Sequence, residues 1–273
     1  MDFNIKLGNG QVLSGFIKSP GSDLRAVIIM VHGLGEHIRR YEPLAQRFSE
    51  QKIGFTGVDL PGHGQSDGKK GHIRDYELIG DMLDILLEES RKTFPGIPQF
   101  VYGHSLGGGI VLNYLLKREP SVRGSIITSP WLKLSFEPEK YRIWLAGFIN
   151  RIFPSFTMPA GLVPAHISHD TKAVSDYLKD PLVHGKISVR LFSEAMRAAD
   201  FVLANAGRLK VPVLLMHGSD DKICSPEGSR LFKSFTGYAD LRIWDGGYHE
   251  LHHEHFKEDV FDDITRWINE RLL

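Results

Sequence analysis

Short apolar runs alternate with segments of helical periodicity along most of the chain. Residues 26–31 form a continuous apolar run rich in β-branched side chains, which predicts a buried central strand. Residues 75–93 place their apolar side chains on one broad face and predict an amphipathic helix. Further strands are expected at 54–59, 99–102, 124–128, 211–216 and 241–244, and further helices at 40–51, 108–117 and 256–272. This alternation indicates an α/β fold with a mostly parallel central sheet and helices on both faces.

The first two expected strands have a different connection. Residues 4–7 and 12–18 lie on either side of Gly8-Asn9-Gly10, a sequence typical of a tight turn between paired strands. We therefore expect the sheet to begin with an antiparallel N-terminal hairpin.

The alternation stops between residues 131 and 193, a stretch rich in aromatic residues and proline. We expect a core built in two parts, residues 1–130 and 194–273, with residues 131–193 (the cap segment) inserted as a helical cap. The alternative is an ordinary set of core helices. Residues 141–153 are apolar nearly all round. Such a helix is buried on two sides or contacts an apolar partner, and a micelle or membrane surface is one such partner.

Composition restricts the partners and the cellular compartment. The 33 basic and 33 acidic residues balance, so no overall charge draws the chain to nucleic acid. The single cysteine, Cys224, excludes an internal disulfide and fits a reducing compartment. No apolar run reaches the ~18 residues of a membrane span, and residues 1–6 lack the features of a signal peptide. We therefore expect a cytoplasmic protein whose membrane contact, if any, is peripheral.

The most informative motif is Gly103-His104-Ser105-Leu106-Gly107. It lies between an expected strand and an expected helix. Glycines two residues before and after Ser105 leave room for a sharp strand-to-helix turn, which presents a serine hydroxyl in an exposed, strained geometry. The motif and its position predict a nucleophilic serine and favour a serine hydrolase.

Acyl transfer by a serine needs a base for the hydroxyl proton and an acid that orients this base. His249 follows the expected strand 241–244 after a glycine-containing loop, and it is the candidate base. The expected strand 211–216 is followed by two carboxylates, Asp220 and Asp221. We favour Asp221 as the acid, because its spacing from Gly218 is the usual one, and assign Asp220 to the loop.

The oxyanion formed during acyl transfer needs hydrogen-bond donors. We expect the backbone N–H of Leu106, which follows the nucleophile, and the N–H of Leu34, in the loop after the strand 26–31. The loss of one such donor typically costs about 10²–10³ in kcat.

Four motifs resemble those of the monoacylglycerol lipase/lysophospholipase branch of the α/β-hydrolases. They are His32-Gly33-Leu34-Gly35-Glu36-His37, Gly62-His63-Gly64-Gln65-Ser66-Asp67-Gly68, Gly103-His104-Ser105-Leu106-Gly107-Gly108 and Tyr248-His249-Glu250-Leu251-His252. The likeness extends over nearly the whole chain and is looser in the cap segment. It implies the α/β-hydrolase fold and a cofactor-free hydrolase of monoacyl lipid esters, above all monoacylglycerol. The alternatives are a lysophospholipase and a general carboxylesterase.

The resemblance also implies a polar pocket for the glycerol head group, lined in that family by the residues that match Glu36, Arg40 and His252. From the residues alone, Glu36 and Arg40 are equally compatible with a surface ion pair, and His252 with the start of a helix. In similar enzymes a cysteine lies near the catalytic acid, so we expect Cys224 to border the substrate pocket.

Three other functions compete with this interpretation. His249-Glu250-Leu251-His252-His253 matches a zinc protease signature, but Gly246 and Gly247 directly before it disfavour the helix that this signature needs, so we expect no metal. A binding protein with a vestigial site would not need the full set of serine, acid and base. A peptidase would need an anionic pocket for an α-amino group.

Overall fold

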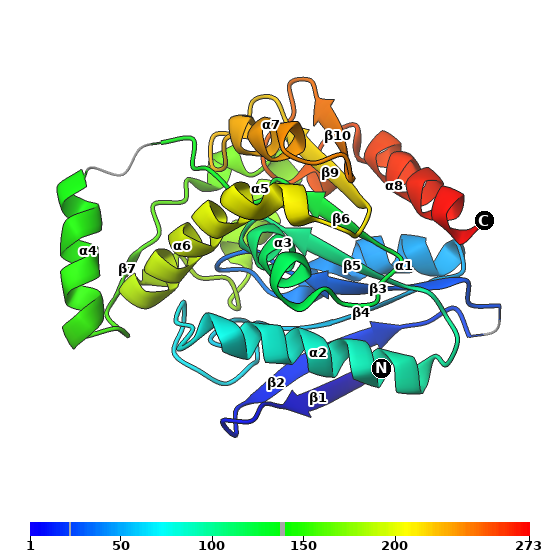
Figure 1. Cartoon of the computed structure of the whole chain (residues 1–273), viewed down its shortest axis with the longest axis horizontal. Helices are drawn as coiled ribbons and strands as arrows, with labels where there is room; N and C mark the ends of the chain where they lie inside the picture. Colours follow the sequence, from blue (N-terminus) through cyan, green and yellow to red (C-terminus); the bar gives the residue numbers. More distant parts are fainter. Residues whose placement is uncertain (22, 137–139) are drawn as a thin grey trace.

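The computed structural model describes residues 1–21, 23–136 and 140–273, the side chains of 140–145 excepted. Within these ranges one sheet of eight strands forms the centre of the molecule, in the order β1-β2-β4-β3-β5-β6-β9-β10 (Figure 1). Its strands are β1 (Asp2–Lys6), β2 (Val12–Lys18), β3 (Ala26–Val31), β4 (Ile53–Val58), β5 (Gln99–His104), β6 (Gly124–Thr128), β9 (Val213–Gly218) and β10 (Ala239–Trp244).

Among these strands, only β2 is antiparallel to both of the strands beside it. It pairs antiparallel with β1 and with β4, whereas β3, β4, β5, β6, β9 and β10 pair in parallel. The expected N-terminal hairpin is therefore confirmed. Every residue of β3, β4, β5, β6 and β9 is buried, as continuous apolar runs in a parallel sheet must be when helices cover both faces.

Helices cover the sheet on both sides. The helices are α1 (Glu42–Glu50), α2 (Tyr76–Thr93), α3 (Leu106–Arg118), α4 (Lys140–Ile152), α5 (Thr171–Lys179), α6 (Val189–Asn205), α7 (Pro226–Ser234) and α8 (Lys257–Leu272). One apolar core lies between the sheet and α2, α3, α6 and α7, and a second lies between the sheet and α1 and α8. The predicted α/β-hydrolase fold, with its mostly parallel sheet, is thus confirmed.

The helix expected at residues 40–51 begins differently. A short 3-10 turn, η1 (Ile38–Tyr41), precedes α1, whose first turn contains Pro43. Proline is favoured in the first turn of an α-helix, where its missing N–H has no partner to lose, and this explains why α1 starts where it does.

The cap segment contains α4 and α5, as a helical insertion should, but it also contains two short strands. Strands β7 (Thr157–Pro159) and β8 (Lys186–Ser188) form a separate antiparallel pair. Helix α6 runs through residue 193, so the expected end of the cap segment falls inside a helix. The division of the chain at residues 131 and 193 stays a prediction.

Figure 1 shows α4 at one end of the molecule, away from the central sheet. The side chains of residues 140–145, on which the expectation of an all-round apolar helix partly rests, lie outside the described residues. No helix in the described part of the chain combines the length and the apolar character needed to cross a membrane.

A strained turn joins β5 to α3. Ser105 has φ 54° and ψ −118°, in the region of positive φ that residues with a side chain rarely adopt. A Cβ atom added to Gly107 would lie 2.1 Å from the carbonyl oxygen of Val31 on β3, and one added to Gly103 would lie 2.6 Å from the oxygen of Gly107. The two glycines therefore allow the first turn of α3 to pack directly on the end of the sheet.

Gly107→Ala should destabilise the protein by about 1–3 kcal/mol, as overpacking typically does, and it should lower ester hydrolysis because Ser105 is displaced. The matched control is Gly147→Ala in α4, where an added Cβ meets no atom of the described residues within 4 Å. This control should keep or slightly raise the midpoint of thermal unfolding. Equal unfolding midpoints for both variants, measured by circular dichroism, would contradict the close packing of the turn.

Candidate active site

Three buried polar side chains meet at the carboxyl ends of parallel strands of the sheet. Ser105 follows β5, Asp221 lies in the loop after β9, and His249 lies in the loop after β10. The Nε2 atom of His249 lies 2.8 Å from Oγ of Ser105, and its Nδ1 atom lies 2.7 Å from Oδ2 of Asp221. Because the carboxylate only accepts, Nδ1 carries the proton and Nε2 is left to accept the proton of the serine hydroxyl. The structure thus brings together all three residues proposed from the sequence.

The two candidate carboxylates differ clearly in their surroundings. Asp221 is buried, and its Oδ1 accepts hydrogen bonds from the backbone N–H groups of Ile223 and Cys224 at 2.8 and 3.0 Å. Asp220 is exposed, and its carboxylate accepts a hydrogen bond from the hydroxyl of Ser219. Asp221 is therefore the carboxylate that contacts His249, and Asp220 belongs to the loop.

The environment shifts the pKa values of Asp221 and His249 in opposite directions. Burial alone would raise the pKa of Asp221, but the charge of His249 and hydrogen bonds from His217 and His249 outweigh burial and lower this pKa well below its usual range. Burial alone would lower the pKa of His249, but the carboxylate of Asp221 outweighs it and raises this pKa. An ionised Asp221 is therefore positioned to stabilise the imidazolium that forms when His249 takes a proton.

The backbone N–H groups of Leu34 and Leu106 flank the serine. Leu106 is the first residue of α3, and neither N–H donates a hydrogen bond to any residue in the described ranges. Gly33 lies beside the serine, since a Cβ added to it would be 3.1 Å from Cβ of Ser105. This geometry suits two donors for an oxyanion, and their assignment stays a prediction.

Buried side chains hold the loop of residues 32–37 in place. Nδ1 of His32 donates to the carbonyl oxygen of Gly33 at 2.8 Å, and Nε2 accepts from the N–H of Leu60 at 2.8 Å. Burial lowers the pKa of His32 to about 3, so the ring stays neutral and keeps both bonds. Oε1 of Glu36 accepts from the N–H of Gly33 at 2.5 Å. The loop that carries Leu34 is therefore fixed before any substrate arrives.

A narrow, mostly apolar cavity of ≈ 60 Å³ opens onto Ser105. Side chains of the cap segment form much of its wall, and Glu36, Glu250 and His249 supply polar groups beside the serine. The apolar lining consists of Leu34, Trp131, Leu134, Phe136, Ala160, Leu162, Ile167, Ile187, Phe192 and Ile223. Cys224 also lines this cavity, which confirms the expectation that it borders the pocket. Burial raises the pKa of its thiol, so the thiolate is scarce at neutral pH.

The three expected head-group residues do not share one surface. Glu36 lines the cavity at Ser105, whereas Arg40 and His252 line a separate open groove of ≈ 920 Å³. Arg40 is buried between two carboxylates: Nη1 donates to Oε2 of Glu36 at 2.7 Å, and both Nη atoms donate to Glu250 at 2.7 and 2.9 Å. Glu36 and Arg40 thus form a buried ion pair rather than the surface pair considered above.

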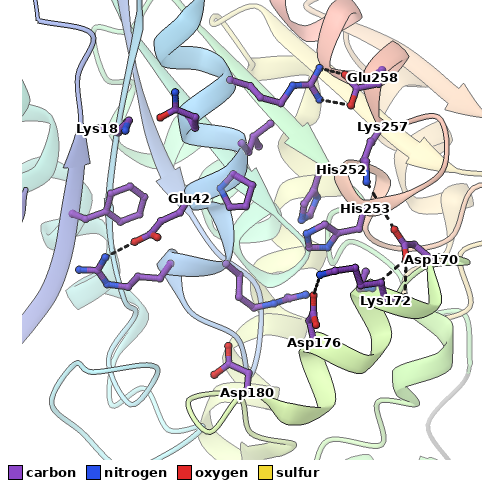
Figure 2. A pocket seen from close by; sticks show the side chains of 18 of the residues that line it. Lys18, Glu42, Asp170, Lys172, Asp176, Asp180, His252, His253, Lys257 and Glu258 are labelled. Carbon is purple, nitrogen blue, oxygen red and sulfur yellow. Dashed lines mark hydrogen bonds and ion pairs between the residues drawn. The ribbon is translucent and has the colours of Figure 1, made fainter.

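Figure 2 shows the open groove, with His252 and His253 next to each other at one side. Its rim carries both signs of charge, and several of these charges pair with one another, as Lys172 does with Asp176 at 2.6 Å. A groove in which both signs of charge alternate presents no single-sign surface to attract an ionic ligand.

One group of residues in the described ranges has the spacing of metal ligands, namely Glu250, His252 and His253. Glu250 already accepts two bonds from Arg40 and one from Nδ1 of His253, and the positive charge of Arg40 would repel a cation. Burial alone would raise the pKa of Glu250, but Arg40 and His253 outweigh it and hold this pKa well below its usual range. The helix that the zinc protease signature needs does not form, because only the short turn η4 (Leu251–His253) follows His249.

Sequence reasoning missed two residues of this site. Glu250 lines the cavity and holds Arg40, and His217 lies 3.1 Å from Oδ2 of Asp221 through its Nε2 atom. Glu250 is adjacent to the candidate base, and His217 is at the carboxyl end of the strand that precedes the candidate acid. Adjacency to the candidate base could have pointed to Glu250, and position at a strand end could have pointed to His217.

Comparison with known proteins identifies the family. The fold defines an α/β-hydrolase, and a family model described as serine aminopeptidase, S33, matches residues 22–255. A monoacylglycerol lipase from Mycolicibacterium smegmatis is 30% identical over 93% of this chain and 91% of its own. The crystal structure of the monoacylglycerol lipase of Paleococcus ferrophilus superposes with a TM-score of 0.87 and 33% identity, over 95% of this chain and 99% of that one.

A further relative is an uncharacterised abhydrolase domain-containing protein of Dictyostelium discoideum, 36% identical over 90% of this chain. The chain spans about a quarter of that protein, 26% of its length. Together these findings confirm the resemblance noted in the sequence. The chain belongs to the serine aminopeptidase S33 family, in its monoacylglycerol lipase/lysophospholipase branch, and is a carboxylic ester hydrolase.

The raised pKa of His249 sets the expected pH dependence. A base must be neutral to accept a proton, so kcat/KM for ester hydrolysis should rise with pH along a limb whose midpoint lies above ~6.5, the ordinary value for histidine. The pH profile of kcat/KM measures this midpoint, and circular dichroism over the same range serves as the control for unfolding. A midpoint at or below ~6.5 in a folded protein would contradict the coupling of His249 to Asp221.

Proposed function

We propose that this chain hydrolyses the ester bond of monoacyl lipids, above all monoacylglycerol, to the free alcohol and a fatty acid. The observation that carries the proposal is the unbroken chain of hydrogen bonds from Ser105 through His249 to Asp221, at the end of an apolar cavity. Such a chain activates a hydroxyl group that is otherwise a weak nucleophile. An apolar cavity beside it suits an acyl chain.

In this mechanism Ser105 Oγ attacks the ester carbonyl carbon while Nε2 of His249 takes the hydroxyl proton. The N–H groups of Leu34 and Leu106 stabilise the oxyanion of the tetrahedral intermediate. The imidazolium of His249, stabilised by Asp221, then protonates the departing alcohol, and an acyl-enzyme remains. A water molecule, deprotonated by His249, repeats the sequence and releases the fatty acid.

The acyl chain would occupy the apolar cavity, but the cavity must widen to admit it. Its ≈ 60 Å³ suffices for a few water molecules, whereas pockets for drug-sized ligands typically measure about 300–1,000 Å³. Phe136 lines this cavity and is half exposed, and Phe192 also lines it. These two side chains would move apart to admit the acyl chain.

The alcohol part of the substrate would lie at the polar end of the cavity. Glu36 and Glu250 present carboxylates there, and these accept hydrogen bonds from hydroxyl groups such as those of glycerol. Arg40 and His252 would act from behind this wall, Arg40 by holding both carboxylates in place. Two carboxylates with one arginine leave a negative charge, which favours glycerol over the phosphate of a lysophospholipid.

The cap segment would bring the enzyme to its lipid substrate. Ile152, Phe153 and Phe156 are exposed at the end of α4 and just after it, and Phe153 is 66% exposed. A cluster of exposed apolar side chains suits transient contact with a micelle or a membrane surface.

A substrate comparison tests the proposal. Rates should rank monoacylglycerol first, p-nitrophenyl esters of the same acyl chain next and lysophospholipid last, and Ser105→Ala should lower all of them by at least ~10³-fold. A fluorophosphonate should modify Ser105 in the native protein. Faster turnover of lysophospholipid than of monoacylglycerol would favour the lysophospholipase alternative. Equal rates for all esters would favour the general carboxylesterase. Activity that survives in Ser105→Ala would contradict the mechanism itself.

Glu36→Gln tests the head-group contact. The variant should lower kcat/KM for monoacylglycerol about tenfold more than for the matched p-nitrophenyl ester, because a hydrogen bond to a charged acceptor is lost only with glycerol. The comparison uses the ratio of kcat/KM for monoacylglycerol to kcat/KM for the p-nitrophenyl ester. A disturbance of the Gly33 loop would lower both values alike and so would leave this ratio unchanged.

The matched control for this experiment is Glu42→Gln, an exposed carboxylate of the open groove that pairs with Arg39. It should leave both rates within about twofold of the parent protein. Equal losses on both substrates in Glu36→Gln would remove the head-group assignment.

A further inference from the structure

The carboxylate of Asp221 contacts a second imidazole besides that of His249. Nε2 of His217 lies 3.1 Å from Oδ2 of Asp221, the same oxygen that contacts His249. Nε2 of His217 also lies 3.0 Å from the carbonyl oxygen of Cys224, and Nδ1 lies 2.7 Å from Oγ of Ser229 in α7. The side chains of His217 and Asp221 are completely buried, and so is Ser229.

The partners of His217 fix its tautomer. Both contacts of Nε2 are acceptors, so Nε2 carries the proton. The hydroxyl of Ser229, whose O–H is free to rotate, can then donate its hydrogen to Nδ1. The result is a row of hydrogen bonds from Ser229 through His217, Asp221 and His249 to Ser105. On each side of Asp221 the row has a histidine and then a serine.

Only one end of this row reaches the substrate cavity. Ser105 and His249 line the cavity, whereas His217 and Ser229 do not. His217 therefore has no access to a substrate and can act on the reaction only through Asp221.

His217 completes the set of donors around the Asp221 carboxylate. Oδ1 accepts from two backbone N–H groups, and Oδ2 accepts from His217 and His249. With both oxygens held on two sides, the carboxylate cannot rotate about its Cβ–Cγ bond without losing buried hydrogen bonds to an ionised group, which are among the stronger ones in proteins. Without His217, the bond to His249 would be the sole restraint on Oδ2.

We propose that His217 is a positioning residue of the hydrolysis reaction, which holds Asp221 in the orientation that serves His249, with Ser229 holding the far side of the His217 ring. This inference rests on the proposed catalytic function of Ser105, His249 and Asp221.

The variants His217→Gln and His217→Asn separate this role from simple packing. Glutamine places its side-chain nitrogen near the position of Nε2 and keeps a donor for Asp221. Asparagine reaches only as far as Nδ1, so it keeps the contact with Ser229 and loses the one with Asp221. Both replacements are polar amides, so the two variants are matched in chemistry and differ in reach.

We expect His217→Gln to keep kcat within about threefold of the parent protein, and His217→Asn to lower kcat about ten- to hundredfold, with KM within about twofold in both. Rates are expressed per active site, titrated with a fluorophosphonate after long exposure, so that unfolded protein does not count. A role in packing alone would lower the number of active sites or the unfolding temperature and leave kcat per site unchanged.

Equal kcat per site in the two variants would overturn the proposal. If neither variant folds, Ser229→Ala decides, because it removes the contact that holds the His217 ring at Nδ1. A kcat lowered several-fold per site supports the positioning role, and an unchanged kcat overturns the proposal. Ser105→Ala distinguishes the two levels of inference, because activity in that variant would refute the proposed function, whatever the His217 variants do.

Discussion

The close approach of helix α3 to the end of strand β3 is the constraint on which the site depends. With no Cβ on Gly107, the first turn of α3 packs against the carbonyl oxygen of Val31. This packing forces Ser105 into a positive φ, because the chain must reverse direction within one residue. The same packing places the loop that carries Leu34 beside the serine. The strain is thus held by the packing of the helix on the sheet.

Buried charges surround this turn, and each has a partner. Arg40 lies between Glu36 and Glu250, and Asp221 lies among four donors that include His249. An unpaired charge at such depth would cost several kcal/mol, so these groups can remain ionised only as sets. The arrangement keeps a base, an ionised acid and two further carboxylates within one small volume. The polar wall of the cavity is thus held together by buried hydrogen bonds, whereas side chains of the cap segment form much of its apolar wall.

The framework of the fold follows from the sequence because its signals are local. A continuous apolar run such as residues 26–31 can be satisfied only as a buried strand, and a one-sided pattern such as residues 75–93 only as a surface helix. The motif around Ser105 combines glycine positions with a strand and a helix, so it predicts a backbone shape as well as a chemistry. The short strands β7 and β8 were missed, because three-residue strands leave no periodic pattern in a sequence rich in proline.

The sequence by itself determined the fold class, the nucleophile candidate and the order of acid and base along the chain. Only the tertiary structure decided that Asp221 rather than Asp220 contacts His249, that Arg40 and His252 line a groove separate from the cavity, and that His217 contacts the same carboxylate. The physical reason is the distance along the chain over which each kind of signal acts. Periodicity and turn signals act between residues a few positions apart, whereas a hydrogen bond between side chains from different strand ends exists only once the sheet has brought those ends together.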